Sequence, residues 1–310
     1  MPARQREKPK KPHLAMIIVA VTATLLIAWV TASQVSKDAT LGRNALQQVK
    51  DLVALGPRPS GSEAHKKMEQ MIVERLQAAG LNPDQDRFTA EGPNGPLLMN
   101  NIIARMKGRD QRILILATHY DTKLERNFPF VGANDGGSGT GLLLAMAPLL
   151  AKRSFNHSVW LVFLDGEESI PQEWSDKDSL FGSRHLAAEL TANGTVRQVG
   201  AFILLDMIGD ADLHILKDSN STPWLRDLVW SVAAKLGDSR YFDGPPNSIE
   251  DDHIPLVQAG VPSVDLIDLD YGPNGSYWHT AQDTVDKLSA QTLQAVGDVA
   301  QAALAELDKK

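Results

Sequence analysis

The sequence contains no cysteine among its 310 residues. That absence excludes disulfide bonds, a thiolate nucleophile and any zinc site built on cysteine ligands. A metal ion in this protein would therefore have to be bound by histidine, aspartate and glutamate side chains.

Basic residues are scarce beyond the first 32 positions. Residues 1–32 contain five basic residues and one acidic residue, so the rest of the chain contains 26 basic and 37 acidic residues. Proteins that bind nucleic acid present basic patches, because every phosphate carries negative charge. We therefore expect no nucleic-acid partner.

Long linkers, internal repeats and low-complexity segments are also absent. From residue 43 onwards, short apolar runs alternate with segments that carry helical spacing. The apolar runs lie at 99–106, 112–118, 159–165, 201–207 and 262–268. The helical segments lie at 43–55, 62–79, 138–152, 179–192, 223–236 and 288–307. Because strands that are apolar throughout belong to parallel sheets covered on both faces, we expect one α/β domain over residues 43–310. It should be a three-layer α/β/α sandwich around a largely parallel, mixed central sheet.

The N-terminus carries the clearest topological signal. A basic stretch precedes nineteen uncharged residues at 14–32. At about 1.5 Å per residue, they nearly span a hydrocarbon core of about 30 Å. The positions of the charges predict a cytoplasmic basic tail at 1–13, a transmembrane signal-anchor helix at 14–32 and a tether at 33–42. The body would then lie outside the cytoplasm, in the periplasm, at the cell exterior or in a secretory lumen. A cleaved signal peptide is the alternative.

Polar residues gather where the predicted strands end. Ligands of open α/β sheets bind beyond the carboxyl ends of the strands. The acidic and histidine side chains at these ends are His119, Asp121, Asp135, Glu167, Glu168, Asp206 and His279. Each alone would more often be a turn former, a helix cap or a structural residue. Together they form an oxygen and nitrogen environment that suits a catalytic zinc ion with an open position.

The order of these residues resembles that of a known superfamily. The segments HYDTK (119–123), GANDGGSG (132–139), DGEES (165–169), LLDMIG (204–209) and WHT (278–280) are similar to the M28 zinc metallopeptidases. The resemblance covers nearly all of residues 45–290 and implies a zinc-aminopeptidase-like fold. In the two-metal aminopeptidases of this superfamily, the ligands match His119, Asp135, Glu168, Asp206 and His279, and the general base matches Glu167.

Three further stretches resemble the glutaminyl cyclases (glutaminyl-peptide cyclotransferases) of the superfamily. They are WSDKDSLFGSRHLA (174–187), EDDHIPLVQAGVP (250–262) and YWHT (277–280). The resemblance implies one zinc ion, held by Asp135, Glu168 and His279. It also implies roles for five other residues: Glu167 as the acid–base residue, Asp206 and Asp251 as its hydrogen-bonded partners, and Trp278 and Trp174 as parts of the substrate pocket.

The implied activity is conversion of an N-terminal glutamine, and more slowly glutamate, to pyroglutamate, with release of ammonia from glutamine. The partners would be peptide or protein N-termini, and we expect a monomer. The sequence departs from the animal cyclases in several features, including the segment from Glu168 to Trp174, which is one residue longer. Asp265 stands where they have histidine, and the loop before His279 is longer, with Tyr271 as a candidate for the aromatic residue that the family carries there.

Two other functions remain open at this point. All the residues of a second metal site are present, with His119 as its distinctive ligand, so a two-zinc aminopeptidase fits the same motifs. A non-catalytic M28-like ectodomain that serves as a receptor or scaffold is the third possibility. It is disfavoured because known domains of that kind have lost metal ligands, whereas this chain retains them.

Overall fold

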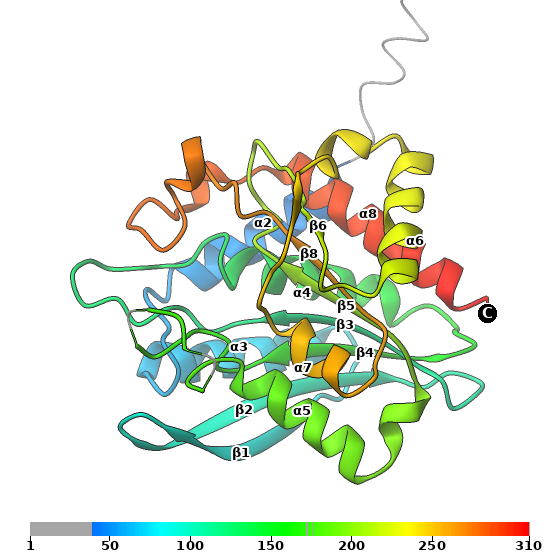
Figure 1. The fold of residues 1–310 in the computed structure, drawn as a ribbon, viewed down its shortest axis with the longest axis horizontal. Coiled ribbons are helices and arrows are strands. Elements are labelled where there is room, and N and C mark those ends of the chain that lie inside the picture. Colours follow the sequence, from blue (N-terminus) through cyan, green and yellow to red (C-terminus); the bar gives the residue numbers. More distant parts are fainter. Residues whose placement is uncertain (1–38, 172, 176, 310) are drawn as a thin grey trace, which may run out of the picture. The chain divides into compact units, whose positions relative to one another are not determined.

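The structure, a computed structural model, describes residues 39–171, 173–175 and 177–309. Its main sheet contains six strands in the order β1-β2-β4-β3-β5-β8 (Figure 1). These strands are β1 (Asp84–Gly92), β2 (Gly95–Met106), β3 (Ile113–His119), β4 (Ser158–Leu164), β5 (Val199–Asp206) and β8 (Ser263–Ile267). Two short strands, β6 (Lys217–Asp218) and β7 (Pro246–Asn247), pair separately. The helices are α2 (Thr40–Val53), α3 (Glu63–Ala78), α4 (Gly137–Leu150), α5 (Phe181–Ala192), α6 (Pro223–Leu236), α7 (His253–Gln258) and α8 (Ala290–Leu307).

The sheet is mixed, as expected. Strands β4, β3, β5 and β8 run parallel, whereas β1 and β2 form an antiparallel hairpin that joins the sheet through β4. In this register, His119 lies opposite Leu164, and Asp206 lies opposite Ile267. The carboxyl ends of the parallel strands therefore meet at one edge of the sheet, which confirms the expected α/β architecture.

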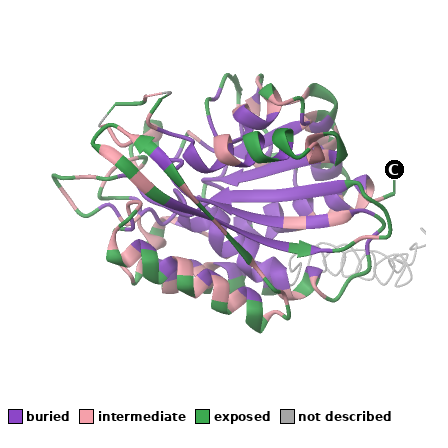
Figure 2. Ribbon diagram, turned by 90° about the horizontal axis from the view of Figure 1, so that it is seen from below, coloured by how far each residue is buried: buried purple, intermediate pink, exposed green. Residues whose placement is uncertain are grey.

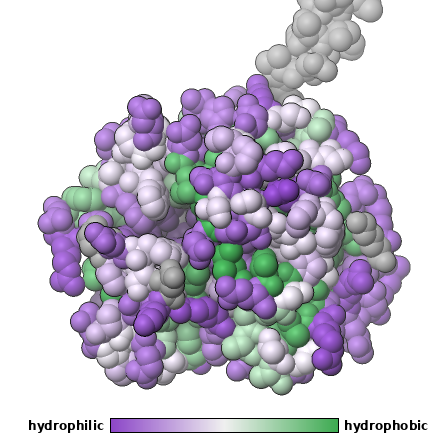
Figure 3. Space-filling model, in the orientation of Figure 1, coloured by the Kyte–Doolittle hydropathy of each residue, from purple (hydrophilic) through white to green (hydrophobic). Residues whose placement is uncertain are grey.

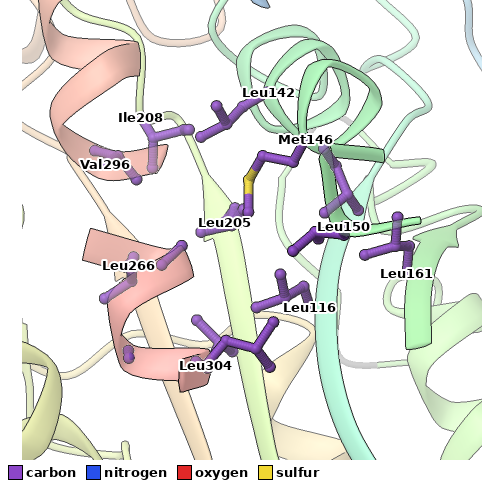
Figure 4. Close-up of a cluster of buried hydrophobic side chains, with 14 of the residues drawn as sticks. Leu116, Leu142, Met146, Leu150, Leu161, Leu205, Ile208, Leu266, Val296 and Leu304 are labelled. Atoms are coloured by element: carbon purple, nitrogen blue, oxygen red, sulfur yellow. The ribbon is translucent and has the colours of Figure 1, made fainter. Parts of the chain in front are cut away.

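Buried side chains pack against both faces of the sheet. On one face, Leu116 of β3 belongs to a cluster with Met146 of α4 and Leu304 of α8 (Figure 4). On the other face, Ile115 packs in a cluster with Leu186 of α5. Figure 2 shows the central strands buried along most of their length, while the outer surfaces of the helices are exposed. Successive side chains of a strand point to opposite faces of the sheet, so each central strand contributes to a hydrophobic core on both faces.

Besides the two-residue strands β6 and β7, two elements differ from the sequence-based expectation. Strand β1 is absent from the predicted set because its side chains are mostly polar and only Ala90 of the strand is buried. Such a strand at a sheet edge has no continuous apolar run to reveal it. Helix α7 is also unpredicted, since six residues are too few to show helical periodicity.

The membrane prediction falls mainly on residues that the structure does not describe. The expected tail at 1–13, the expected transmembrane segment at 14–32 and residues 33–38 of the tether lie outside the described part. Residues 40–42, the end of the expected tether, belong to helix α2. Within residues 39–309, no described helix combines the length and the apolar character needed to cross a bilayer.

A buried histidine fixes helix α3 against the sheet close to the strand ends. His65 Nε2 lies 2.9 Å from an oxygen of Asp165, and its Nδ1 lies 3.4 Å from an oxygen of Glu69. Burial disfavours the imidazolium, but the charge and hydrogen bond of Asp165, aided by Glu69, raise the pKa of His65 to about 10. Because the two ring nitrogens face different carboxylates, we interpret this group as a structural ion pair rather than a metal site. It anchors the strand end that leads into Glu167.

Removing this ion pair should destabilise the protein most at low pH. The folded-state pKa of His65 lies above its ordinary value of 6.5, so the stabilisation is complete below about pH 6.5 and is lost as the pH rises towards 10. His65→Gln should therefore lower the free energy of unfolding by about 3 kcal/mol at pH 6 and by less at pH 9.5. Denaturant unfolding at both pH values measures this difference. Lys66→Gln, beside it on the exposed face, is the control, and an equal loss at both pH values for His65→Gln would contradict the ion pair.

Candidate active site

The site residues predicted from the sequence lie around the carboxyl ends of the parallel strands. His119 and Asp206 are the last residues of β3 and β5, and Glu167 and Glu168 follow β4. Asp135 lies in the turn before α4, and Asp251 precedes α7. Trp174 lies between β4 and α5, whereas Trp278 and His279 lie between β8 and α8. Segments far apart in the sequence thus deliver acidic, imidazole and indole side chains to one region.

The backbone conformation at Gly136 and hydrogen bonds to Asp121 hold the acidic side chains of the site in position. Gly136 follows Asp135 with a φ of 69°, and a Cβ atom there would lie 2.4 Å from the backbone oxygen of Asp121. Only glycine fits this turn, since a side chain would meet both conformational strain and a clash. The carboxylate of Asp121 accepts hydrogen bonds from the backbone N–H groups of Glu167 and Glu168, at 3.1 and 3.3 Å. Asp121 thereby links the Asp135 turn to the glutamate pair.

Three side chains form a site that fits a single cation. Nε2 of His279 lies 3.2 Å from Oδ2 of Asp135 and 3.4 Å from Oε2 of Glu168. Oδ2 of Asp135 is buried and has no hydrogen-bond donor within the described chain. Two carboxylates and one imidazole that converge in this way match the ligand chemistry of catalytic zinc. The side chains of Asp135, Glu168 and His279 therefore fit a zinc ion.

A second set of possible ligands shares Asp135 with the first. His119, Asp135 and Asp206 also place ligand atoms within 4.8 Å of one another. Nε2 of His119 lies 3.1 Å from Oδ1 of Asp206 and 3.3 Å from Oδ1 of Asp135. Asp135 could therefore bridge two metal ions, so the geometry of the ligands is compatible with one ion or with two.

Glu167 is a buried carboxyl group that faces the cavity but belongs to neither ligand set. Burial raises its pKa well above the usual range. The nearby charges of Glu168, Asp251 and Asp252 raise it further, while His119 opposes them. A raised pKa makes the carboxylate a stronger base, which suits a residue that takes a proton from a substrate amine.

The partners expected for Glu167 make different contacts. Asp206 lies against His119, and Oδ1 of Asp251 accepts a hydrogen bond of 2.5 Å from the backbone N–H of its neighbour Asp252. Neither carboxylate is hydrogen-bonded to Glu167 in the described part of the chain. Asp251 therefore acts on Glu167 through its charge rather than through a direct bond.

A cavity of about 270 Å³ opens onto these residues. Trp174 and Trp278 line it, and each has more than two-fifths of its surface exposed. Ile267 and Leu269 add apolar lining. The face seen in Figure 3 is mostly hydrophilic, with a smaller group of apolar residues near its centre. The cavity thus combines apolar walls with an acidic floor, as small-molecule sites commonly do.

Tyr271 does not fill the place that the sequence suggested. It is completely buried, and its hydroxyl donates a 2.8 Å hydrogen bond to Asp283 instead of lining the cavity. The aliphatic side chains of Ile267 and Leu269 line this part of the cavity in its stead. The path of the loop before His279 decides where Tyr271 lies, and sequence spacing alone could not show which aromatic ring turns inward.

Sequence reasoning assigned no role to several buried polar residues around the site. Lys123 donates a 3.1 Å hydrogen bond from its backbone N–H to Glu168, and its ammonium binds the backbone oxygen of Ser169. Asp265 is fully buried beside Asp251, and burial, followed by the charges of Asp251 and Asp206, raises its pKa. An acid within the apolar run PSVDLID is a signal that could have been used, because aspartate is rarely buried without a role.

Comparisons with known proteins agree with this geometry. The sequence profile of the M28 peptidase family matches residues 101–304. A Bos taurus protein, glutaminyl-peptide cyclotransferase-like protein, is 34% identical over 275 residues, which cover 80% of this chain and 70% of the relative. The crystal structure of an Acidobacteriales bacterium glutaminyl cyclase is 44% identical, with a TM-score of 0.82, and the match covers 86% of this chain and 94% of that one.

A zinc-dependent exopeptidase from Parabacteroides distasonis is also similar, at 26% identity and a TM-score of 0.76, over 87% of this chain and 98% of that one. The profile match spans more than half of the chain, and the bovine relative exceeds 30% identity over most of its length. The chain therefore belongs to the M28 peptidase family and, within it, to the glutaminyl-peptide cyclotransferases.

Proposed function

We propose that this protein is a zinc-dependent glutaminyl-peptide cyclotransferase that converts N-terminal glutamine of peptides to pyroglutamate. The observation that carries the proposal is its likeness, over most of the chain, to a glutaminyl cyclase of known structure. The site supports it, because the cavity ends at a ligand set for one cation and at a buried carboxyl group outside that set.

The reaction needs one proton carrier and no water nucleophile. The α-amine of the substrate attacks its own γ-carboxamide carbon, a new C–N bond closes the ring, and the bond to the carboxamide nitrogen breaks to release ammonia. Glu167 would take a proton from the attacking amine and return one to the departing nitrogen. The chemistry supplied by zinc at Asp135, Glu168 and His279 would be Lewis-acid polarisation of the γ-carbonyl oxygen.

The remaining residues would bind and shape the substrate. Trp278 and Trp174 offer flat apolar surfaces at the mouth of the cavity, where the glutamine side chain can be held away from water. The charge of Asp251 raises the pKa of Glu167, which makes the Glu167 carboxylate a stronger base and so assists removal of a proton from the attacking amine. The acidic surroundings also attract the cationic α-amino group of a peptide N-terminus.

The direct test is release of ammonia by the purified full-length protein from a peptide that begins with glutamine. The matched control is the same peptide with an acetylated N-terminus, which lacks the attacking amine. We expect ammonia and a pyroglutamyl product from the free peptide alone. Equal ammonia release from the acetylated peptide would show amide hydrolysis instead of cyclisation.

One observation favours the two-zinc aminopeptidase as a second candidate. The His119, Asp135 and Asp206 set would complete a bridged pair of metal sites. In that enzyme, Glu167 would activate a water molecule for attack on the first peptide bond. The two candidates therefore differ in the number of metal ions required and in the bond that is broken.

We also propose that residues 14–32 anchor the enzyme in a membrane with the catalytic body outside the cytoplasm, as a single-pass, monomeric protein. The basic residues before an uncharged run of nineteen support this orientation. A chain that lacks residues 1–36 should be soluble and active, whereas the full chain should fractionate with membranes. Sedimentation with immunodetection of both ends measures this, and a soluble full chain with an intact N-terminus would refute the anchor.

A further inference from the structure

The loop that carries Trp278 and His279 is closed at its base by one buried side chain. Asp283, four residues after His279, is 1% exposed, and its Oδ1 accepts a 2.8 Å hydrogen bond from the hydroxyl of Tyr271. The backbone N–H of Tyr277 also binds the backbone oxygen of Tyr271 at 3.1 Å. The two ends of the segment 271–283 are therefore tied together.

The same carboxylate reaches the turn that presents another proposed ligand. Oδ1 of Asp283 accepts a second hydrogen bond, of 2.8 Å, from the backbone N–H of Asn134, and Oδ2 accepts one of 3.2 Å from the backbone N–H of Asp135. These bonds fix the direction of the peptide from which the Asp135 side chain projects. One side chain thus contacts both segments that deliver ligands Asp135 and His279.

The surroundings of Asp283 support this bridging position. Arg58, which is fully buried, donates hydrogen bonds to the backbone oxygens of Val131 and Gly132 and brings a positive charge near Asp283. On the other side, the ring of Tyr271 packs edge-on against Tyr277, with their centroids 5.4 Å apart. Rigid contacts on both sides therefore hold the bonds of Asp283 in place.

His279 itself needs such support. Its φ of 49° lies in the left-handed region, which is unfavourable for residues with a side chain. A strained conformation persists only where the surrounding structure imposes it. Its ring has an edge contact with Phe130 at 5.7 Å, but the backbone around it is set by the closed loop. Opening the base of that loop would let His279 relax away from Asp135.

We infer that Asp283 is a positioning residue that, with Tyr271, holds Asp135 and His279 at the separation that zinc binding requires. The inference rests on the proposed zinc ligands, and it gives a role to Tyr271, which the cavity does not use. Residues that orient metal ligands through hydrogen bonds commonly affect metal affinity about 10- to 100-fold.

Two substitutions test the inference separately. In Asp283→Asn, the amide can still accept from Asn134 and Tyr271, but its NH₂ group would oppose the N–H of Asp135. Tyr271→Phe preserves the ring and removes only the hydroxyl that closes the loop. The matched controls are Asp286→Asn, an exposed aspartate three residues further on, and Tyr241→Phe, whose hydroxyl bonds only to Arg240 in the described part of the chain.

The measurement is transfer of zinc from the loaded full-length protein to a chromogenic chelator, followed without any substrate. We expect transfer about 10- to 100-fold faster for Asp283→Asn and about 10-fold faster for Tyr271→Phe, with both controls unchanged. Excess zinc should restore most of the turnover on a glutamine-initiated peptide, which a globally misfolded variant would not show.

The outcomes separate this inference from the function on which it rests. If the parent protein retains zinc and both variants release it at the parental rate, the positioning role is overturned while the proposed enzyme stands. If only Asp283→Asn releases zinc faster, closure of the loop by Tyr271 is overturned. A parent that binds no zinc would overturn the proposed function itself.

Discussion

Replacement of Glu167 by glutamine is expected to lower kcat on a glutamine-initiated peptide by about 10²–10⁴-fold, with little change in KM. Glutamine preserves the shape of the side chain but cannot accept the proton of the attacking amine. The zinc content should stay at the parental level, since the three proposed ligands are intact. Steady-state kinetics with metal analysis of the same sample measures both quantities.

The adjacent substitution Glu168→Gln should give the opposite pattern. Its carboxylate lies 3.4 Å from His279, so its loss should weaken zinc binding and lower activity through the metal. Excess zinc should then recover part of the activity, which it cannot do for Glu167→Gln. Glu173→Gln, exposed in the same loop, should change neither quantity. If Glu167→Gln lost its metal while Glu168→Gln kept it, the two roles would have to be exchanged.

Removal of a proposed zinc ligand is the second change with a large expected effect. Asp135→Ala or His279→Ala should abolish tight zinc binding and reduce turnover to background, because two remaining ligands cannot hold a catalytic zinc ion. His119→Ala should spare the zinc ion, since His119 contacts Asp206 and Asp135 in the second ligand set. Metal content after gel filtration gives the answer.

The control for these variants is His214→Ala, a half-buried histidine outside both ligand sets. It should retain zinc and activity. Loss of metal in His119→Ala to the same extent as in His279→Ala would show that the second set is occupied in the working enzyme. The assignment would then move to the two-zinc aminopeptidase.

The buried strands could be predicted because their own amino-acid composition reveals them. Strands β3, β4 and β5 are covered on both faces, so they consist of continuous apolar residues that stand out in the sequence. Edge strand β1 has an exposed face and polar side chains, and its identity comes from pairing with β2 rather than from composition. Pairing of this kind is a tertiary property that a single sequence does not display.

Some residues of the candidate site could likewise be predicted from the sequence, whereas the contacts of others could not. His119, Asp206 and the glutamate pair could be located because strand ends in a parallel sheet converge. The contacts of Asp283 and Tyr271 could not, because they depend on the path of an irregular loop over residues 271–283. The contact of Asp206 with His119 was also beyond the sequence, because a difference of a few ångströms decides whether Asp206 meets His119 or Glu167.

The central claim is that one zinc ion and Glu167 catalyse cyclisation rather than hydrolysis. The most direct test adds zinc stepwise to chelator-treated protein and follows two reactions on each sample: ammonia release from a glutamine-initiated peptide and amine release from a leucine anilide. We predict that ammonia release saturates near one zinc ion per chain, while the anilide is not cleaved at any ratio. Cleavage of the anilide that rises until two zinc ions are bound, without ammonia release, would contradict the account.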